Sequence, residues 1–317
     1  MSADVVAVAP IVCDLDAVGL DDLGLAGGKG AALGALRGAG IAVPDGFLVT
    51  PAAYREFAAA NDLAGRIGER LAGADGDGGL DQAAADIHVG LATARIPGAV
   101  GEAIVARYLA LSGAPERATV AVRSSTIGPD TPSRALAHAT DTFLCVHGAD
   151  AVLDAVRDCW ASLYRARAIR ARRRLGLSDE AGELAVLVQR QVEAVRAGTI
   201  VTAPAELLVE ATYGLGEAAS AGLVTPDRYV VARDGWRVVD SVIHRKDVVV
   251  EECPPHRGTR VRHVDPEQAV YPALRASQLR ELAQLGAAVE DALGAPQRIE
   301  WALDRAGTAW IVQATPA

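Results

Sequence analysis

The stretch GGKGAALGALRGAG, residues 27–40, decides the expected fold, because it joins a glycine turn, a lysine and the start of a helix. Lys29 is one of two lysines in the chain, against 29 arginines. Under so strong an arginine bias an ordinary surface cation drifts to arginine at little cost, so a surviving lysine indicates a site that needs a compact charge on a flexible stem. The alternative, for Lys29 and for Lys246, is chance survival.

The same glycines predict a helix N-terminus at Lys29. Leu33 and Leu36 follow at helical spacing, and Gly38 closes the segment. Backbone N–H groups and the helix dipole at such an end attract an anion, and a lysine there adds a mobile countercharge. The loop is therefore a candidate anion site.

Two common phosphate-binding motifs are excluded here. A Walker A loop needs a glycine five residues before Gly28 and a Ser or Thr after Lys29, but Leu23 and Gly30 occupy those positions. The dinucleotide motif GxGxxG needs a third glycine where Leu33 stands. The loop by itself does not name a nucleotide.

Composition excludes several classes of protein. The net charge of −9 argues against a nucleic-acid binder, whose affinity depends on clustered cations. Four scattered cysteines without a CxxC pair indicate neither a zinc knuckle nor a disulfide framework. Residues 1–24 lack the Lys or Arg of a signal peptide, and no apolar run approaches the roughly 20 residues that span a bilayer. We expect a soluble cytoplasmic protein that binds neither nucleic acid nor membrane.

The hydrophobic patterns along the chain change near residue 183. Before it, one long helix is predicted over 150–175, with Asp150 as its N-cap and its arginines on a solvated face, and strand 118–125 places Arg123 near its end. After it, strands predominate, with a helix over 271–293 and a closing hairpin. We expect an α+β fold of two lobes, residues 1–182 and 183–317, with a cleft between them.

Six segments carry a family resemblance through their content and their order. They are GGKGAALGALRGAGIAVPDGFLVTPAAYREF, VAVRSS, DTFLCVHGADAVLDAVRDCWASLYRARAI, VLVQRQV, YGLGEAASAGLVTPDRY and GAPQRIEWALD…WIVQATP. This order resembles the N-terminal ATP-grasp domain shared by phosphoenolpyruvate synthase, pyruvate phosphate dikinase and rifampin phosphotransferase. The resemblance runs from about residue 20 to the C-terminus and implies an ATP-grasp fold whose lobes enclose a nucleotide cleft.

The resemblance also implies ligands and roles for five residues. Lys29 and Arg123 would contact the phosphates of ATP, and Gln189 in VLVQRQV would lie by the adenine. Glu300 and Gln313 would hold Mg²⁺. In relatives the domain phosphorylates a histidine on a separate swivelling domain. Because the chain stops where the ATP-grasp domain stops, we expect a His-carrier protein to be a separate partner and a small molecule to be the final substrate.

The geometry of the closing hairpin is compatible with a shared magnesium ion. If Leu303 opposes Thr308, Glu300 lies across from Ile311, and Gln313 falls on the same face one diagonal step away. A slip of one residue would put the two on opposite faces.

Departures from the family cluster at the phosphate end. Relatives end the final strand with Gln-x-Arg-Pro, whose Arg clamps phosphate, and Thr315 stands in its place here. After VAVRSS, Pro129 replaces an acidic residue, and His138 and Ala139 replace a Gly and a Gln; the hairpin GTIVTAPAELL is also trimmed. His138 either fills the cleft, faces solvent, or acts as an acid or base in a repurposed site.

Three functions of different class remain open. The family favours an ATP-dependent phosphotransferase subunit. The departures favour a repurposed ATP-grasp fold that no longer transfers phosphate and acts on an organic metabolite in specialised metabolism, because each lost phosphate contact costs on the order of a hundredfold to a thousandfold in rate. A noncatalytic nucleotide-binding subunit is the third.

Overall fold

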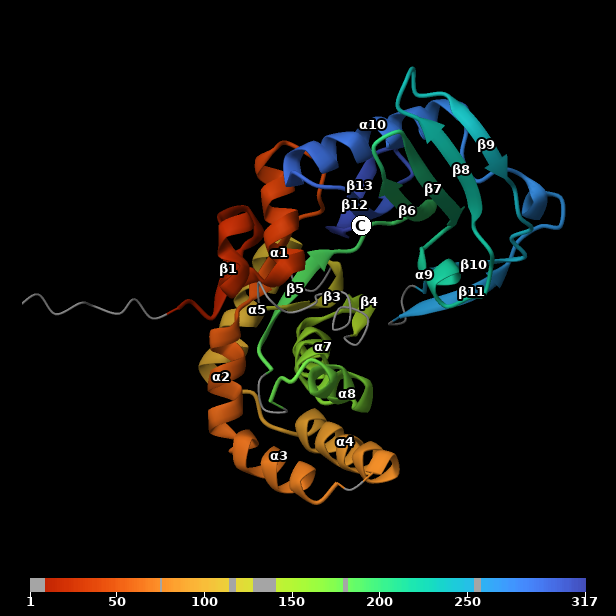
Figure 1. Ribbon diagram of the computed structural model, residues 1–317. Coiled ribbons are helices and arrows are strands. Elements are labelled where there is room, and N and C mark those ends of the chain that lie inside the picture. Colours follow the sequence, from red (N-terminus) through yellow and green to blue (C-terminus); the bar gives the residue numbers. More distant parts are fainter. Residues whose placement is uncertain (1–8, 75, 114–117, 128–140, 179–181, 254–257) are drawn as a thin grey trace, which may run out of the picture. The chain divides into compact units, whose positions relative to one another are not determined.

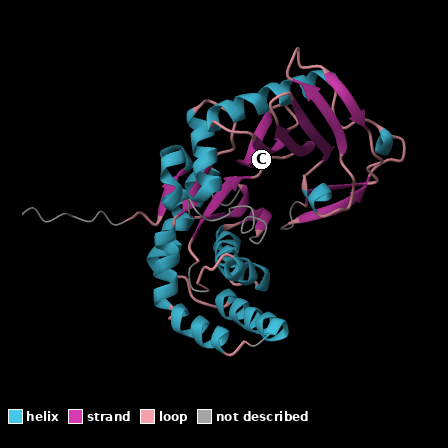
Figure 2. Cartoon of the chain, viewed as in Figure 1, coloured by secondary structure: helices cyan, strands magenta, loops and turns pink. Residues whose placement is uncertain are grey.

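The computed structural model describes the chain except residues 1–8, 75, 114–117, 128–140, 179–181 and 254–257 (Figure 1). It divides into two compact units: unit 1 is Met1–Ala17, Asp21–Gly30 and Gly46–Gln189, and unit 2 is Val18–Leu20, Ala31–Asp45 and Arg190–Ala317. Both helices and sheets contribute, which confirms the α+β class (Figure 2). The predicted boundary after residue 182 lies before the strand Leu184–Arg190, whereas unit 1 extends through that strand to Gln189. The prediction also did not assign Val18–Leu20 and Ala31–Asp45 to unit 2.

Unit 1 contains a five-stranded sheet in the order β1-β2-β5-β3-β4. Strand β2 pairs antiparallel with β1 and with β5, and β3 pairs antiparallel with β4. The central strand β5 is buried on both faces, as its continuous apolar sequence predicts. The strands are β1 (Val12–Asp14), β2 (Gly46–Val49), β3 (Thr119–Thr126), β4 (Thr142–His147) and β5 (Leu184–Arg190).

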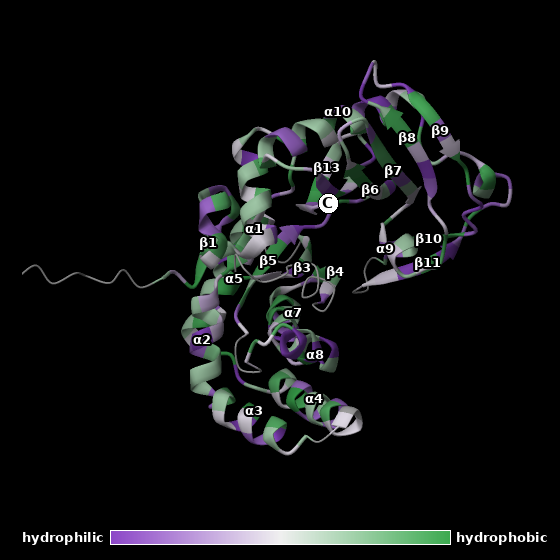
Figure 3. Cartoon of the chain, in the orientation of Figure 1, coloured by the Kyte–Doolittle hydropathy of each residue, from purple (hydrophilic) through white to green (hydrophobic). Residues whose placement is uncertain are grey.

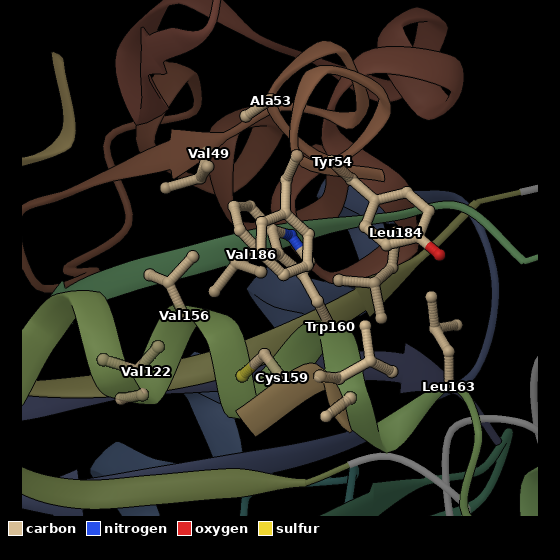
Figure 4. Packing of buried hydrophobic residues seen from close by; sticks show 14 of the residues in the cluster. Val49, Ala53, Tyr54, Val122, Val156, Cys159, Trp160, Leu163, Leu184 and Val186 are labelled. Atoms are coloured by element: carbon tan, nitrogen blue, oxygen red, sulfur yellow. The ribbon is translucent and has the colours of Figure 1, made fainter. Parts of the chain in front are cut away.

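The core of unit 1 surrounds Trp160, a fully buried residue of α7 (Figure 4). Phe57 stacks on its ring at 4.7 Å, and Tyr54 lies tilted at 6.1 Å. Val122 and Val186 reach the same cluster from the sheet. The helices of unit 1 are α2 (Pro51–Ala60), α3 (Leu63–Ala72), α4 (Gly76–Ala92), α5 (Gly98–Ser112), α7 (Ala149–Ser162) and α8 (Ala166–Arg174).

The predicted single helix over 150–175 is wrong, because it is two helices with a break between Ser162 and Ala166. Gly148 rather than Asp150 is the N-cap of α7. At the break Arg172, only 1% exposed, donates from Nη1 to the carbonyl of Leu163 at 2.6 Å. This bond satisfies a carbonyl that the interrupted helix leaves without its usual partner. The solvated face expected of α8, the hydrophilic helix of Figure 3, therefore does not include Arg172.

Unit 2 contains a six-stranded antiparallel sheet in the order β13-β12-β6-β7-β8-β9. Helix α10 (Ala276–Leu293) covers one face, and Gly286 lies so close to Ile200 and Leu207 that a Cβ there would approach them to 3.0 and 3.1 Å. The strands are β6 (Arg196–Thr202), β7 (Glu206–Tyr213), β8 (Asp227–Ala232), β9 (Val238–Val242), β12 (Gln297–Leu303) and β13 (Ala309–Pro316).

The remaining elements of unit 2 are short. They are the hairpin of β10 (Val248–Glu252) and β11 (Thr259–His263), the single turn α9 (Glu217–Ser220) and the 3-10 turn η3 (Gln268–Val270). Helix α1 (Leu23–Gly38) begins in unit 1 and ends in unit 2. Among the described residues, no helix combines the length and hydropathy needed to cross a membrane.

Candidate functional site

The glycine loop is held against the end of β3 by one serine. Gly27 interrupts α1 with φ 65° and ψ 173°, a backbone conformation that is open to glycine alone. The Oγ of Ser125 accepts the amides of Lys29 and Gly30 at 3.1 and 3.2 Å and donates to the carbonyl of Ala26 at 2.7 Å. The predicted helix start at Lys29 is present, but two of its first amides are bound by Ser125 rather than left for an anion.

Lys29 and Arg123 are brought to the same end of β3. Arg123 precedes Ser125 by two residues, so the side chains of both lie on one face of the strand. Each of the two cations is 9% exposed. Burial and the nearby Asp141 raise the pKa of the Cys159 thiol on α7, and the positive charge of Lys29 offsets part of this.

Asp141 adds further charge beside this strand end. Its carbonyl accepts the amide of Ser124 at 3.3 Å. Its carboxylate accepts Nε of Arg165 and Nη2 of Arg167, each at 2.6 Å. Two of the arginines assigned to a solvated face are therefore ion-paired at the start of β4, a contact across more than twenty residues that helical periodicity does not reveal.

Gln189 lies at the end of β5, directly opposite Gly46 on β2, and is 1% exposed. A Cβ at Gly46 would lie 2.7 Å from the carbonyl oxygen of Val188, so this close pairing requires glycine. The predicted adenine-side residue is thus fixed by the sheet of unit 1. His138, the predicted acid or base, falls outside the described residues.

Glu300 and Gln313 face each other directly across β12 and β13 in unit 2. The predicted register is wrong: Leu303 opposes Ala309 rather than Thr308, and Ile311 lies opposite Trp301. A bulge between Glu300 and Trp301 restores the pairing, because one additional residue of β13 is accommodated there. The two side chains share a face, and they are closer than the predicted diagonal.

The turn between these strands is held by Asp304. Its carboxylate accepts the amide of Thr308 and the indole N–H of Trp310, each at 2.9 Å. Burial raises the pKa of Asp304, but these bonds and those from the amides of Ala306 and Gly307 outweigh it, so the pKa lies below its usual value. The turn fixes the strands on which Glu300 and Gln313 lie.

A polar row continues from this pair across the sheet. Glu300 lies opposite Thr199 on β6, and Thr199 lies opposite Glu210 on β7. Thr199 donates from Oγ1 to the carboxylate of Glu210 at 2.9 Å. Sequence reasoning missed Thr199 and Glu210. The period-two alternation of GTIVT and LLVEAT nevertheless places both on one face of the sheet and the buried Ile200 and Val209 on the other.

Lys246 lies in a buried ion pair. Its Nζ donates to Asp227 Oδ1 at 2.6 Å and to the carbonyl of His244 at 2.7 Å, and both charged side chains are fully buried. The ammonium also lies 5.2 Å from the ring centre of Tyr213, and Asp227 Oδ2 accepts the amide of Ala273 at 2.7 Å. Sequence alone left Lys246 undecided between a site that needs a lysine and chance survival. The enclosed space around it favours a compact ammonium over a planar guanidinium.

Thr315, at the position of the family's phosphate-clamping arginine, lies opposite Arg298 on β12. Its Oγ1 is 3.4 Å from the carbonyl of Arg298. Among the described residues, unit 1 thus carries Lys29 and Arg123 at the end of β3, and unit 2 carries the oxygen donors Glu300 and Gln313 on the terminal hairpin.

The sequence of this chain matches the family described as pyruvate phosphate dikinase, AMP/ATP-binding domain, over residues 23–317. A probable phosphoenolpyruvate synthase from Methanothermobacter thermautotrophicus is 35% identical over 96% of this chain and 46% of its own length. The phosphoenolpyruvate synthase of Pyrococcus furiosus is 35% identical over 93% of this chain and 42% of its own. A rifampicin phosphotransferase from Streptomyces sviceus is 38% identical over 92% of this chain and 34% of its own length.

This chain therefore spans less than half the length of each of these relatives. Among solved structures, a D-alanine-D-alanine ligase from Coxiella burnetii aligns over 90% of this chain and 45% of its own with a TM-score of 0.33 and 11% identity, a likeness too remote to support a conclusion. The family match covers nearly all of the described residues, including the loop at Lys29, the strand of Arg123 and the terminal hairpin. The chain belongs to the family of pyruvate phosphate dikinase AMP/ATP-binding domains.

Proposed function

We propose that this chain is the ATP-binding part of a dikinase-type phosphotransferase and passes phosphate to a carrier or acceptor outside these 317 residues. Family membership over residues 23–317 supports the nucleotide. The names of the relatives, phosphoenolpyruvate synthase and rifampicin phosphotransferase, support the reaction class. The observation that carries the proposal is the packing of the glycine loop on the end of β3, where Ser125 Oγ binds the backbone amide of Lys29 and Gly27 leaves no room for a Cβ. Arg123 lies two residues before Ser125 on the same strand.

The end of β3 suits a polyphosphate. Lys29 and Arg123 bring two cations to it in a chain of net charge −9, and each is largely shielded from water. Charge-assisted hydrogen bonds from such cations to phosphate oxygens are shorter and stronger than neutral ones. In this proposal both side chains orient the phosphates and stabilise the negative charge that shifts during transfer.

Glu300 and Gln313 fit magnesium. They offer one carboxylate and one amide oxygen from directly opposed positions, and Mg²⁺ prefers oxygen ligands while keeping several waters. No group of three or more His, Cys, Asp or Glu residues in the described part of the chain could hold a metal, so further ligands would come from water and phosphate oxygens. Bound there, the ion would neutralise phosphate charge. Gln189 would contact the adenine.

A second candidate is a repurposed fold that binds a different organic metabolite and no longer transfers phosphate. The observation that favours it is Thr315, a short neutral side chain where relatives place an arginine. The two candidates differ in one property, since only the first converts ATP to a product.

The test is nucleotide turnover by the purified chain. We expect Mg-ATP to be converted to AMP or ADP when a cell extract supplies the carrier, and conversion to fall at least tenfold with Lys29→Ala. Arg70→Ala, which removes an exposed cation of unit 1, is the matched control and should leave the rate unchanged. Extract-dependent turnover that is indifferent to Lys29 would refute the proposal, and ATP left intact under all conditions would favour the second candidate.

A further inference from the structure

Strand β12 carries an arginine directly across from the position where an arginine is missing. Arg298 lies opposite Thr315 in the antiparallel register of β12 and β13. Side chains at opposed positions share a face, with Cβ atoms about 4.5–5.5 Å apart. An extended arginine side chain is longer than this spacing, so a guanidinium based at Arg298 can reach the space that one based at Thr315 would fill.

Arg298 also shares its face with the proposed magnesium ligands. Ile299, the residue between Arg298 and Glu300, is fully buried and points to the opposite face. The ladder to β6 is regular from Arg298 to Glu300, so no bulge changes this alternation. Arg298 therefore stands one alternate position along the strand from Glu300, and Gln313 lies diagonally across.

The guanidinium of Arg298 is exposed, and it makes no hydrogen bond or ion pair with any residue that the structure describes. Among the exposed arginines of unit 2, Arg245, Arg260 and Arg262 are paired with carboxylates, whereas Arg228 and Arg280, like Arg298, make no ion pair with a described residue. What distinguishes Arg298 is its place two residues before Glu300 on the same face. An unpaired cation beside a cation-binding pair is electrostatically unfavourable unless an anion lies between them. A phosphate group that contacts both a metal and a guanidinium satisfies this requirement.

We propose that Arg298 supplies, from β12, the phosphate-clamping guanidinium that the family resemblance expects on β13 at Thr315. The clamp is displaced by one strand rather than lost. This inference rests on the proposed function, since it assigns Arg298 to the phosphates of the same nucleotide. It removes the main objection to phosphate binding by this chain.

The test removes the guanidinium at position 298 and introduces one at position 315, on the opposite strand of the hairpin. Mg-ATP affinity is measured by calorimetry for the wild type, Arg298→Ala, and Arg298→Ala combined with Thr315→Arg. We expect the single variant to bind about 10- to 100-fold more weakly, in line with loss of one hydrogen bond to a charged group, and the double variant to recover most of the loss. Adenosine, which has no phosphate, should bind all three alike. Arg280→Ala, an exposed arginine on α10, which packs on the opposite face of the sheet, is the matched control.

The possible results separate this inference from the proposed function. If the wild type binds Mg-ATP and Arg298→Ala binds it equally well, Arg298 is not a clamp and the proposed function stands. The inference would also be overturned if Arg298→Ala weakened Mg-ATP binding and the added Thr315→Arg did not restore it. The same holds if Arg298→Ala weakened adenosine binding to the same extent. If the wild type binds no Mg-ATP, both fall together.

Discussion

Replacement of Gly27 by alanine is the sharpest test of how the lysine loop is built. The residue has φ 65° and ψ 173°, and an ideal Cβ there would lie 2.4 Å from both the carbonyl oxygen and the Oγ of Ser125. A carbonyl oxygen of a β-strand cannot move aside as the tip of a flexible side chain can. Either α1 or the end of β3 must therefore shift in Gly27→Ala.

The expected cost follows from two contributions. Holding a residue other than glycine in this backbone region costs about 1–3 kcal/mol. Separating the loop from Ser125 weakens its three hydrogen bonds, to Ala26, Lys29 and Gly30, each worth about 1 kcal/mol. Because the loop relaxes in part, we expect about 3–5 kcal/mol of local destabilisation, which corresponds to more than a hundredfold in the opening equilibrium.

The assay is amide hydrogen exchange across residues 24–36, read alongside urea denaturation. Gly28→Ala is the matched control, since a Cβ at Gly28 meets nothing within 4 Å and alanine is favoured over glycine in a helix by about 1 kcal/mol. Faster exchange of the Lys29 and Gly30 amides in Gly27→Ala alone is the expected result. Equal protection in both variants would refute the described packing of the loop on Ser125.

Three other predictions follow from the sites in unit 2. Lys246→Met should lower unfolding stability by about 3–5 kcal/mol, because it leaves Asp227 charged and buried, and Lys246→Met with Asp227→Asn should recover part of this in thermal denaturation. Because the folded pKa of Asp304 is depressed, its contribution is present above the unfolded pKa of about 3.9 and is lost as the pH falls through the folded pKa. Asp304→Asn should therefore be less stable than the wild type at pH 7, and the difference should shrink as the pH falls below about 3.9 and the carboxylate becomes protonated. Glu300→Gln should weaken ATP binding in the presence of Mg²⁺ and leave binding without the ion nearly unchanged.

Each of these predictions has a contrary outcome. Full stability of Lys246→Met would mean that the pair is not enclosed as described. A stability difference for Asp304→Asn that persists at low pH would assign the effect to the shape of the turn rather than to the charge. Equal weakening by Glu300→Gln with and without Mg²⁺ would remove the residue from the metal site.

The spacing and alternation of residues in the sequence correctly predicted features that depend on neighbouring positions of the chain. The glycine turn and helix start at Lys29, the strand of Arg123, and the shared face of Glu300 and Gln313 all follow from spacing and alternation. The register of the terminal hairpin was predicted wrongly by one residue at the turn, where Leu303 opposes Ala309 rather than Thr308. The bulge between Glu300 and Trp301 then adds one more residue of β13, and no composition rule marks a bulge.

Features set by tertiary contacts could not be predicted. The break between α7 and α8 is stabilised by Arg172, whose sequence context reads as a surface helix. Lys246, which lies between β9 and β10, has Asp227 of β8 as its partner. Arg165, which follows α7 in the sequence, pairs with Asp141, which precedes that helix. Such pairs are fixed by topology, and the sequence shows only that a lysine was retained.

The central claim is that Lys29 binds the phosphates of a nucleotide and that arginine cannot replace it there. Calorimetric titration with Mg-ATP of the wild type, Lys29→Ala and Lys29→Arg tests this claim most directly. The account predicts saturable binding by the wild type and at least a tenfold loss in both variants, because the guanidinium is larger and planar. Absence of binding by the wild type at millimolar ATP, or wild-type affinity in Lys29→Ala, would contradict it.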